Sequence, residues 1–95
     1  MVTLVLDLTG VTSLDEFHDR VAEALKLPDH YGRNLDAFWD CLTELVGRTT
    51  VRVVGLLGLD GALRTQVDRY LKLLVDQEAE SRGEFSVSLS KVDDD

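Results

Sequence analysis

Residues 28–46 read PDHYGRNLDAFWDCLTELV, and the spacing of apolar and acidic residues in this segment predicts a loop followed by a helix. Asn34 is a natural N-cap residue, because its side chain can accept a hydrogen bond from a free backbone amide at the start of the helix. Gly47, just after the segment, is a plausible residue to end the helix. The apolar side chains between these two recur at helical spacing: Leu35, Phe38, Leu42, Leu45 and Val46. We therefore expect a half-buried helix between Asn34 and Gly47.

The predicted helix carries a row of negative charge. Asp36, Asp40 and Glu44 recur every four residues, which places them as neighbours about 5–6 Å apart at Cβ on a helix. No lysine or arginine between positions 34 and 47 offsets this repulsion. Trp39 neighbours Asp36 and Asp40 at the boundary of the apolar stripe. The acidic row is typical either of a solvated helix face or of a surface that binds a basic partner. Trp39 is either an aromatic residue at the boundary of the core or an anchor of a binding interface.

Before this segment the chain predicts one strand and one helix. Residues 2–7 form a short β-branched run, which indicates a strand that is largely buried. Ser13 and Glu16 match a capping box, in which the serine bonds the amide three residues on and the glutamate reaches back. The following apolar spacing predicts a helix over 13–26, which Pro28 prevents from continuing. In the loop 29–33, Gly32 is free to take a positive φ.

After the segment the pattern predicts a strand, a long helix and a last strand. The strand covers 49–54 (TTVRVV), and a glycine-punctuated loop with at most one helical turn follows. Asp60 is the expected cap of a helix over 61–82, whose inward residues are Leu63, Val67, Tyr70, Leu71 and Leu74. Phe85, Val87 and Leu89 alternate with serines, as in a strand with one less buried face.

The resulting order, β-α-α-β-α-β, predicts an α/β fold with a small three-stranded parallel sheet packed with helices. We expect a single domain over residues 1–92 and a frayed acidic tail over 93–95.

The charge balance narrows the possible partners. The 95 residues include 18 Asp and Glu against 10 Lys and Arg, a formal net charge of −8. Phosphates would repel such a chain, so direct binding to nucleic acid or to an anionic membrane is not expected. The negative charge favours a basic partner through long-range attraction, or serves solubility alone.

The single cysteine and the N-terminal segment indicate a cytoplasmic protein. Cys41 cannot form an internal disulfide, which suits a reducing compartment. The N-terminal apolar run is short and lacks a basic start, so we expect neither a signal peptide nor a membrane span.

Several chemistries remain open from the residues alone. Asp36 and Asp40 are a possible acid–base pair, and His30 with Cys41 a possible base and nucleophile. Carboxylates four residues apart also suit calcium or magnesium, although two or three oxygens from one helix face are too few alone. No dinucleotide glycine fingerprint, phosphate loop or paired Cys/His zinc spacing occurs in the sequence. We therefore expect no cofactor, no metal and no enzymatic activity.

Residues 27–46 resemble the signature segment of the barstar family, intracellular inhibitors of secreted microbial ribonucleases. The matching pieces are Leu27-Pro28, Tyr31-Gly32, Asn34-Leu35-Asp36-Ala37 and Trp39-Asp40-Cys41-Leu42-Thr43. The resemblance implies the same α/β fold and a protein that plugs the active site of a guanyl-specific ribonuclease in a one-to-one complex. In the family, the second helix and the loop before it enter the catalytic cleft.

The resemblance also implies individual roles. Asp40 would be the central phosphate mimic, Asp36 the second acidic contact, and Trp39 an interface residue. His30 occupies the position from which a family tyrosine stacks on the catalytic histidine. The expected partner-binding residues are His30, Tyr31, Asn34, Leu35, Asp36, Trp39, Asp40, Thr43, Glu44 and Glu78.

Some positions depart from the family pattern or align in more than one way. Glu78 aligns with a further acidic contact near the end of the last helix, with Asp76 or Glu80 as alternatives. Glu44 and Leu45 replace a glycine and an aromatic residue, and one cysteine replaces two. The sequence therefore leaves open a different ribonuclease target, and also a barstar-like adaptor that binds another basic protein without inhibiting it.

Overall fold

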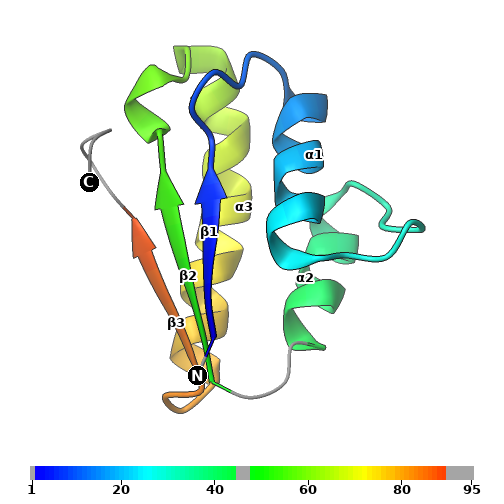
Figure 1. Cartoon of the computed structure of the whole chain (residues 1–95), viewed down its shortest axis with the longest axis vertical. Helices are drawn as coiled ribbons and strands as arrows, with labels where there is room; N and C mark the ends of the chain where they lie inside the picture. Colours follow the sequence, from blue (N-terminus) through cyan, green and yellow to red (C-terminus); the bar gives the residue numbers. More distant parts are fainter. Residues whose placement is uncertain (1, 45–47, 90–95) are drawn as a thin grey trace.

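The computed structural model describes residues 2–44 and 48–89 and shows three strands and three main helices (Figure 1). In chain order the elements are β1 (Val2–Asp7), α1 (Leu14–Leu25), α2 (Leu35–Thr43), β2 (Thr49–Val54), the 3₁₀ turn η1 (Leu56–Gly58), α3 (Gly61–Glu80) and β3 (Phe85–Leu89). The strands form one parallel sheet in the order β1-β2-β3, with Thr49 paired to both Val2 and Phe85. The predicted α/β fold and its element order are confirmed.

The core lies between the sheet and the helices. Figure 1 shows α3 behind the strands and α1 beside them. In β2, Thr49, Val51 and Val53 are buried while the alternate residues are only half-buried, as expected when one face of a sheet is covered. α1 contacts β1 and α3, and α2 contacts α3. α2 is therefore held by another helix, which leaves one of its faces at the surface.

β1 is more exposed than its sequence predicts. It is an outer strand of the sheet, and the side chains of Val2 and Val5 are 50% and 49% exposed. Only Leu6 within the strand is fully buried. The expectation of a largely buried strand is wrong, because Val5 lies opposite Arg52 on the less covered face of the sheet and β1 has a neighbouring strand on one side only.

The predicted helix caps are confirmed. Ser13 Oγ accepts a hydrogen bond from the amide of Glu16 (3.1 Å), and Glu16 Oε1 reaches back to the amide of Thr12 (2.7 Å). Asn34 Oδ1 accepts from the amide three residues on (2.8 Å). Asp60 Oδ1 accepts from the amides two and three residues on (2.9 and 3.1 Å). Side-chain hydrogen bonding of this kind is local, which is why the sequence predicts it well.

α2 ends at Thr43, earlier than expected, and Glu44 caps it in right-handed helical conformation (φ −91°, ψ −6°). The expected continuation through Leu45 and Val46 to Gly47, and the expected tail over 93–95, lie outside the described residues. Within the described residues, none of the helices combines the length and apolar character needed to cross a membrane. The 20-residue α3 has one buried stripe, made of the five residues predicted to point inward.

Candidate functional site

The acidic row lies on the surface of α2. Asp36, Asp40 and Glu44 are all exposed, and none forms an ion pair with another described residue. Asp36 lies in the first turn, where the positive end of the helix dipole favours a carboxylate. Asp40 and Glu44 lie at the opposite end, where the dipole disfavours them and no basic residue compensates. The free protein therefore holds two negative charges in an unfavourable place, and a partner's positive charge would relieve both.

Apolar residues flank this row. Trp39 is half-buried and packs against the hydrophobic core, so it is a boundary residue with part of its surface accessible. Leu35 was expected in the apolar stripe but is 37% exposed at the start of α2, whereas Phe38 and Leu42 are fully buried. Thr43 is exposed, and its hydroxyl donates to the backbone carbonyl of Asp40 (2.8 Å). The exposed side of α2 thus combines carboxylates with apolar surface.

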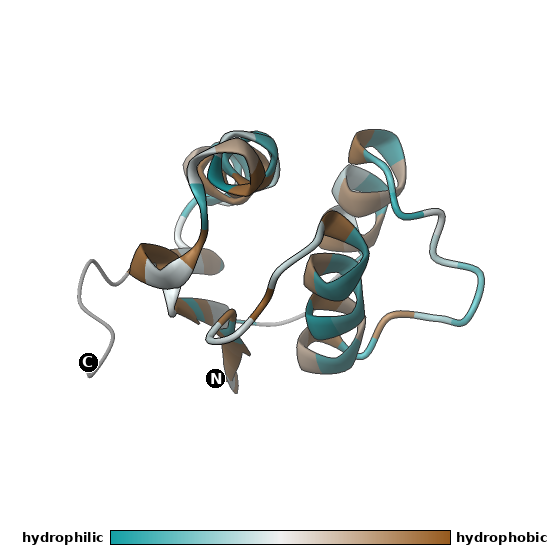
Figure 2. Ribbon diagram, turned by 90° about the horizontal axis from the view of Figure 1, so that it is seen from above, coloured by the Kyte–Doolittle hydropathy of each residue, from teal (hydrophilic) through white to brown (hydrophobic). Residues whose placement is uncertain are grey.

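The loop that joins α1 to α2 (residues 26–34, named the α1–α2 loop) has a defined backbone. Seen from above in Figure 2, it lies on the side of the molecule away from the sheet. Arg33 takes a positive φ of 55°, whereas Gly32, which glycine's freedom would allow to take one, does not. Space is limited there as well, because a Cβ at position 32 would make a tight contact of 3.2 Å with the Cβ of Ala37. The loop and the first turn of α2 are therefore closely packed.

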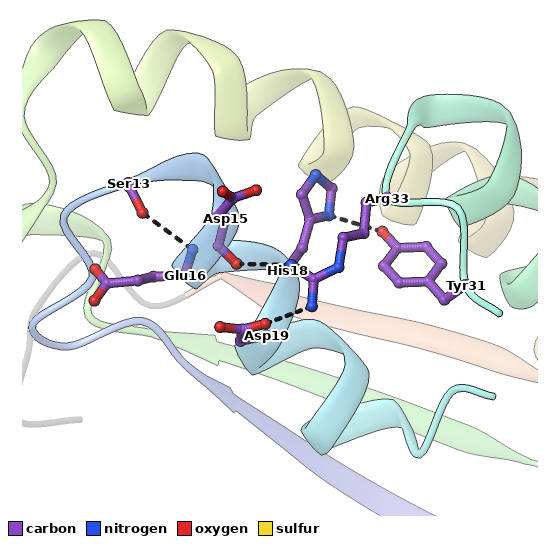
Figure 3. Close-up of polar contacts among 7 residues, drawn as sticks. All are labelled: Ser13, Asp15, Glu16, His18, Asp19, Tyr31 and Arg33. Atoms are coloured by element: carbon purple, nitrogen blue, oxygen red, sulfur yellow. Dashed lines mark hydrogen bonds and ion pairs between the residues drawn. The ribbon is translucent and has the colours of Figure 1, made fainter. Parts of the chain in front are cut away.

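Three contacts attach the α1–α2 loop to α1 (Figure 3). Arg33 forms an ion pair with Asp19 (2.5 Å) and donates to the backbone carbonyl of Asp15 (3.4 Å). The Tyr31 hydroxyl lies 2.9 Å from Nδ1 of His18. His18, Asp19 and Arg33 were not predicted from the sequence as parts of the site. His18 had a detectable signal, because it lies four residues after Leu14 and three before Val21, a helical spacing that places it on the inward side of α1.

Tyr31 and His18 are core residues. Their side chains are 8% and 2% exposed, and the two rings pack edge-on with centroids 5.6 Å apart. Burial is the main cause that lowers the pKa of His18, and the Arg33 guanidinium lowers it further. Burial likewise raises the pKa of Tyr31. His18 Nε2 has no hydrogen-bond partner among the described residues. In the free protein, Tyr31 therefore anchors the α1–α2 loop to the core. It was expected as a partner-binding residue, and this structural role was not predicted.

A cavity of about 180 Å³ opens between the α1–α2 loop and α2, and it is named the loop cavity here. Its lining includes His30, Asp40 and Glu44 from the expected site, together with Pro28 and Cys41. A second hollow of about 160 Å³ adjoins it and shares Pro28, Cys41 and Glu44. A further hollow of about 320 Å³, between β1 and α1, shares no lining residue with either. The loop cavity is thus the hollow that is lined by both Asp40 and Glu44 at the acidic end of α2.

The environment of Cys41 argues against a nucleophilic role. The pKa of its thiol is raised, chiefly by burial and then by the carboxylates of Glu44 and Asp40. A raised pKa leaves little thiolate at neutral pH, and the thiolate is the reactive form. In the described part of the chain, no group of three His, Cys, Asp or Glu side chains is arranged to hold a metal ion.

Glu78 lies apart from the other expected residues. It is half-buried near the end of α3, and its Oε2 accepts a hydrogen bond from the backbone amide of Val87 (3.2 Å). It lines neither the loop cavity nor the adjoining hollow. Of the two alternatives at this end of α3, Asp76 lies 3.5 Å from Lys72 in an ion pair, and Glu80 is exposed. The structure therefore brings together the expected residues of the loop and α2, and leaves Glu78 with an intramolecular partner.

Comparison with known proteins gives the family. A family model described as "Barstar (barnase inhibitor)" matches residues 1–90. A protein of Bacillus subtilis (strain 168) named "Putative ribonuclease inhibitor YrdF" is 31% identical over 88 residues, which are 92% of this chain and 97% of that protein. The family match includes the whole described structure, and the α1–α2 loop and α2 lie inside it. The chain therefore belongs to the barstar family.

Proposed function

We propose that this protein inhibits a secreted, guanyl-specific microbial ribonuclease by covering its active site with α2 and the α1–α2 loop. In this complex Asp40 occupies the site of an RNA phosphate, and Asp36 binds a second cationic group one turn earlier. The observation that carries the proposal is the row of exposed carboxylates without an ion-pair partner among the described residues, in a chain of the barstar family.

The electrostatics support this arrangement. A ribonuclease concentrates lysine, arginine and histidine side chains where it binds RNA phosphates, and carboxylates form short charge-assisted hydrogen bonds with such groups. The net charge of −8 attracts a basic enzyme over a longer range than direct contact. Because the free protein has unfavourable charge at the end of α2, complex formation removes a repulsion as well as adding attraction.

The anchored loop supports a preformed binding surface. Arg33 and Tyr31 attach the loop to α1, and Asn34 fixes the start of α2. A surface that is ordered before binding loses less conformational entropy in the complex, which favours tight binding. His30 is exposed on this loop and lines the loop cavity together with Asp40, which supports a contact of both residues with the enzyme. The lone thiol and the inhibitory role both suit a cytoplasmic location, where an inhibitor protects the cell before the enzyme is secreted.

Titration of the purified protein into a ribonuclease assay tests the proposal. Barnase and other secreted guanyl-specific ribonucleases are the probe enzymes, with cleavage of a fluorescent RNA as the readout. We expect stoichiometric one-to-one inhibition of at least one of them, and exclusion of a nucleotide substrate analogue from the inhibited enzyme. Absence of inhibition of every enzyme at micromolar inhibitor would overturn the proposal. Binding that leaves the substrate analogue in place would instead favour a barstar-like adaptor.

A further inference from the structure

We propose that Glu44, together with Asp40, makes the loop cavity a socket for one lysine or arginine side chain of the partner ribonuclease. Occupation of this socket then selects which ribonuclease the protein inhibits. The inference deepens the function proposed above and rests on it for the identity of the partner. The preference of the cavity for a cationic side chain stands on the structure of the free protein and can be measured without any ribonuclease.

The size and lining of the loop cavity suit a single side chain. Its volume of about 180 Å³ is below the range of roughly 300–1,000 Å³ typical of small-molecule sites. Its lining combines the largely apolar residues Pro28, Tyr31 and Ala37 with the acidic residues Asp40 and Glu44. Lysine and arginine have this same division, with an aliphatic stem that packs on apolar surface and a charged end that seeks carboxylates.

The charges around the loop cavity are unbalanced. Its lining contains Asp40 and Glu44, and the one side chain there that can become positive is His30. Lys26 lines only the adjoining hollow and forms no ion pair with Glu44 or any other described residue. The negative end of the α2 dipole adds to the carboxylates. The cavity therefore attracts a cation and repels an anion.

The raised pKa of the Cys41 thiol is consistent with a negative potential at the cavity wall. Cys41 lines both hollows, and after burial the largest cause of the raised pKa of its thiol is the Glu44 carboxylate, ahead of Asp40. The two carboxylates thus act on the same point from neighbouring turns of the chain. Glu44 is held there by its backbone, because its amide donates to the carbonyls of Cys41 and Leu42 at the end of α2.

Glu44 gives selectivity as well as attraction. The resembling family segment has glycine at this position, so the carboxylate is a feature of this chain. A ribonuclease that presents lysine or arginine to the cavity gains a charge-assisted contact. A ribonuclease that presents an apolar or acidic group there leaves Glu44 desolvated or repelled, which disfavours the wrong partner.

An NMR titration of the free, full-length protein tests the socket directly. The probes are Nα-acetyl-L-argininamide and Nα-acetyl-L-lysinamide, and the matched neutral control is Nα-acetyl-L-citrullinamide, which has nearly the shape of the arginine probe. We expect saturable shifts of the backbone amides at 30–32 and 40–44 with the cationic probes only, and at least threefold weaker binding to Glu44→Gln. Equal binding of the citrulline probe, or unchanged binding to Glu44→Gln, would overturn the socket.

A second measurement links the socket to inhibition. Glu44→Gln and the matched variant Glu23→Gln, which removes the same charge from the exposed surface of α1, are compared on the ribonuclease that the wild type inhibits most strongly. We expect at least tenfold weaker inhibition for Glu44→Gln and less than twofold change for Glu23→Gln. Equal losses for both variants would refute selectivity through Glu44. If the protein inhibits no ribonuclease but probe binding still depends on Glu44, the ribonuclease is refuted as the partner. The loop cavity then remains a socket for a cationic side chain.

Discussion

Replacing Tyr31 with phenylalanine removes the hydroxyl that lies 2.9 Å from His18 Nδ1, and leaves both ring nitrogens of a buried imidazole without a described partner. His18 is 2% exposed, so water cannot take the place of the hydroxyl unless the core opens. An unsatisfied buried polar group costs about 1–3 kcal/mol. In a domain of this size each kcal/mol lowers Tm by about 4–8 °C, so Tyr31→Phe is expected to lower Tm by at least about 4 °C.

A matched control exists in the same cluster of rings. Tyr70 packs edge-on against His18 with centroids 5.0 Å apart, but its hydroxyl makes no hydrogen bond with the described residues. Tyr70→Phe should therefore change the free energy of unfolding by less than about 0.5 kcal/mol. Urea unfolding at pH 7.5, followed by Trp39 fluorescence and by circular dichroism, measures both variants. Equal stability of Tyr31→Phe and the wild type would refute the assigned role of the hydrogen bond.

The same pair predicts a pH dependence of stability. Burial lowers the pKa of His18 below its ordinary value of 6.5, so the unfolded chain binds this proton more readily than the folded protein does. Stability from neutral His18 is therefore fully present above pH 6.5 and is lost as the pH falls through 6.5 toward the lower folded pKa. His18→Gln, which keeps a polar group but cannot titrate, should flatten this part of the profile. An identical slope between pH 7 and 5 in the wild type and His18→Gln would contradict the prediction.

Three further predictions concern the acidic end of α2. Asp40→Ala should weaken ribonuclease binding by about 3–5 kcal/mol, because it leaves a buried cation of the enzyme unpaired. Isothermal titration calorimetry measures this loss. A loss below about 1 kcal/mol would place Asp40 at the rim of the interface instead of its centre. Raising the salt from about 0.05 M to 0.5 M should slow association more than it speeds dissociation in surface plasmon resonance, since screening acts on separated charges; an unchanged association rate would exclude steering. Glu44→Gln should lower the pKa of Cys41 and so speed its alkylation by iodoacetamide near pH 8, and an unchanged alkylation rate would show that Glu44 does not act on the thiol.

The sequence predicted those parts of the fold that depend on neighbours along the chain. Ser13, Asn34 and Asp60 cap helices through amides two or three residues away, so the relevant chemistry is visible in four consecutive letters. It did not predict the exposure of Val5, because the order of the strands and the face of the sheet that the helices cover depend on contacts between distant segments. Nor did it predict that Arg33, rather than Gly32, takes the positive φ.

For the candidate site, spacing on one helix was sufficient to predict the row of Asp36, Asp40 and Glu44. The anchoring of the loop was not predicted, because Tyr31 and His18 are 13 residues apart and belong to different elements. The loop cavity escaped prediction for the same reason, since it forms only where the α1–α2 loop folds back on α2. Roles that depend on a partner stay predictions until the complexes described above are measured.

The hydrogen bond from the Val87 amide to Glu78 has a consequence for solubility. β3 is an outer strand, and an unpaired amide on such a strand is a template on which another chain can add a strand. Glu78 occupies this amide and brings negative charge to the same margin of the sheet, which deters edge-to-edge aggregation. A ribonuclease that bound Glu78 would break this hydrogen bond and expose the Val87 amide at the edge of the sheet. The Glu78 carboxylate therefore protects the edge strand β3 against self-association as long as it stays bonded to the Val87 amide.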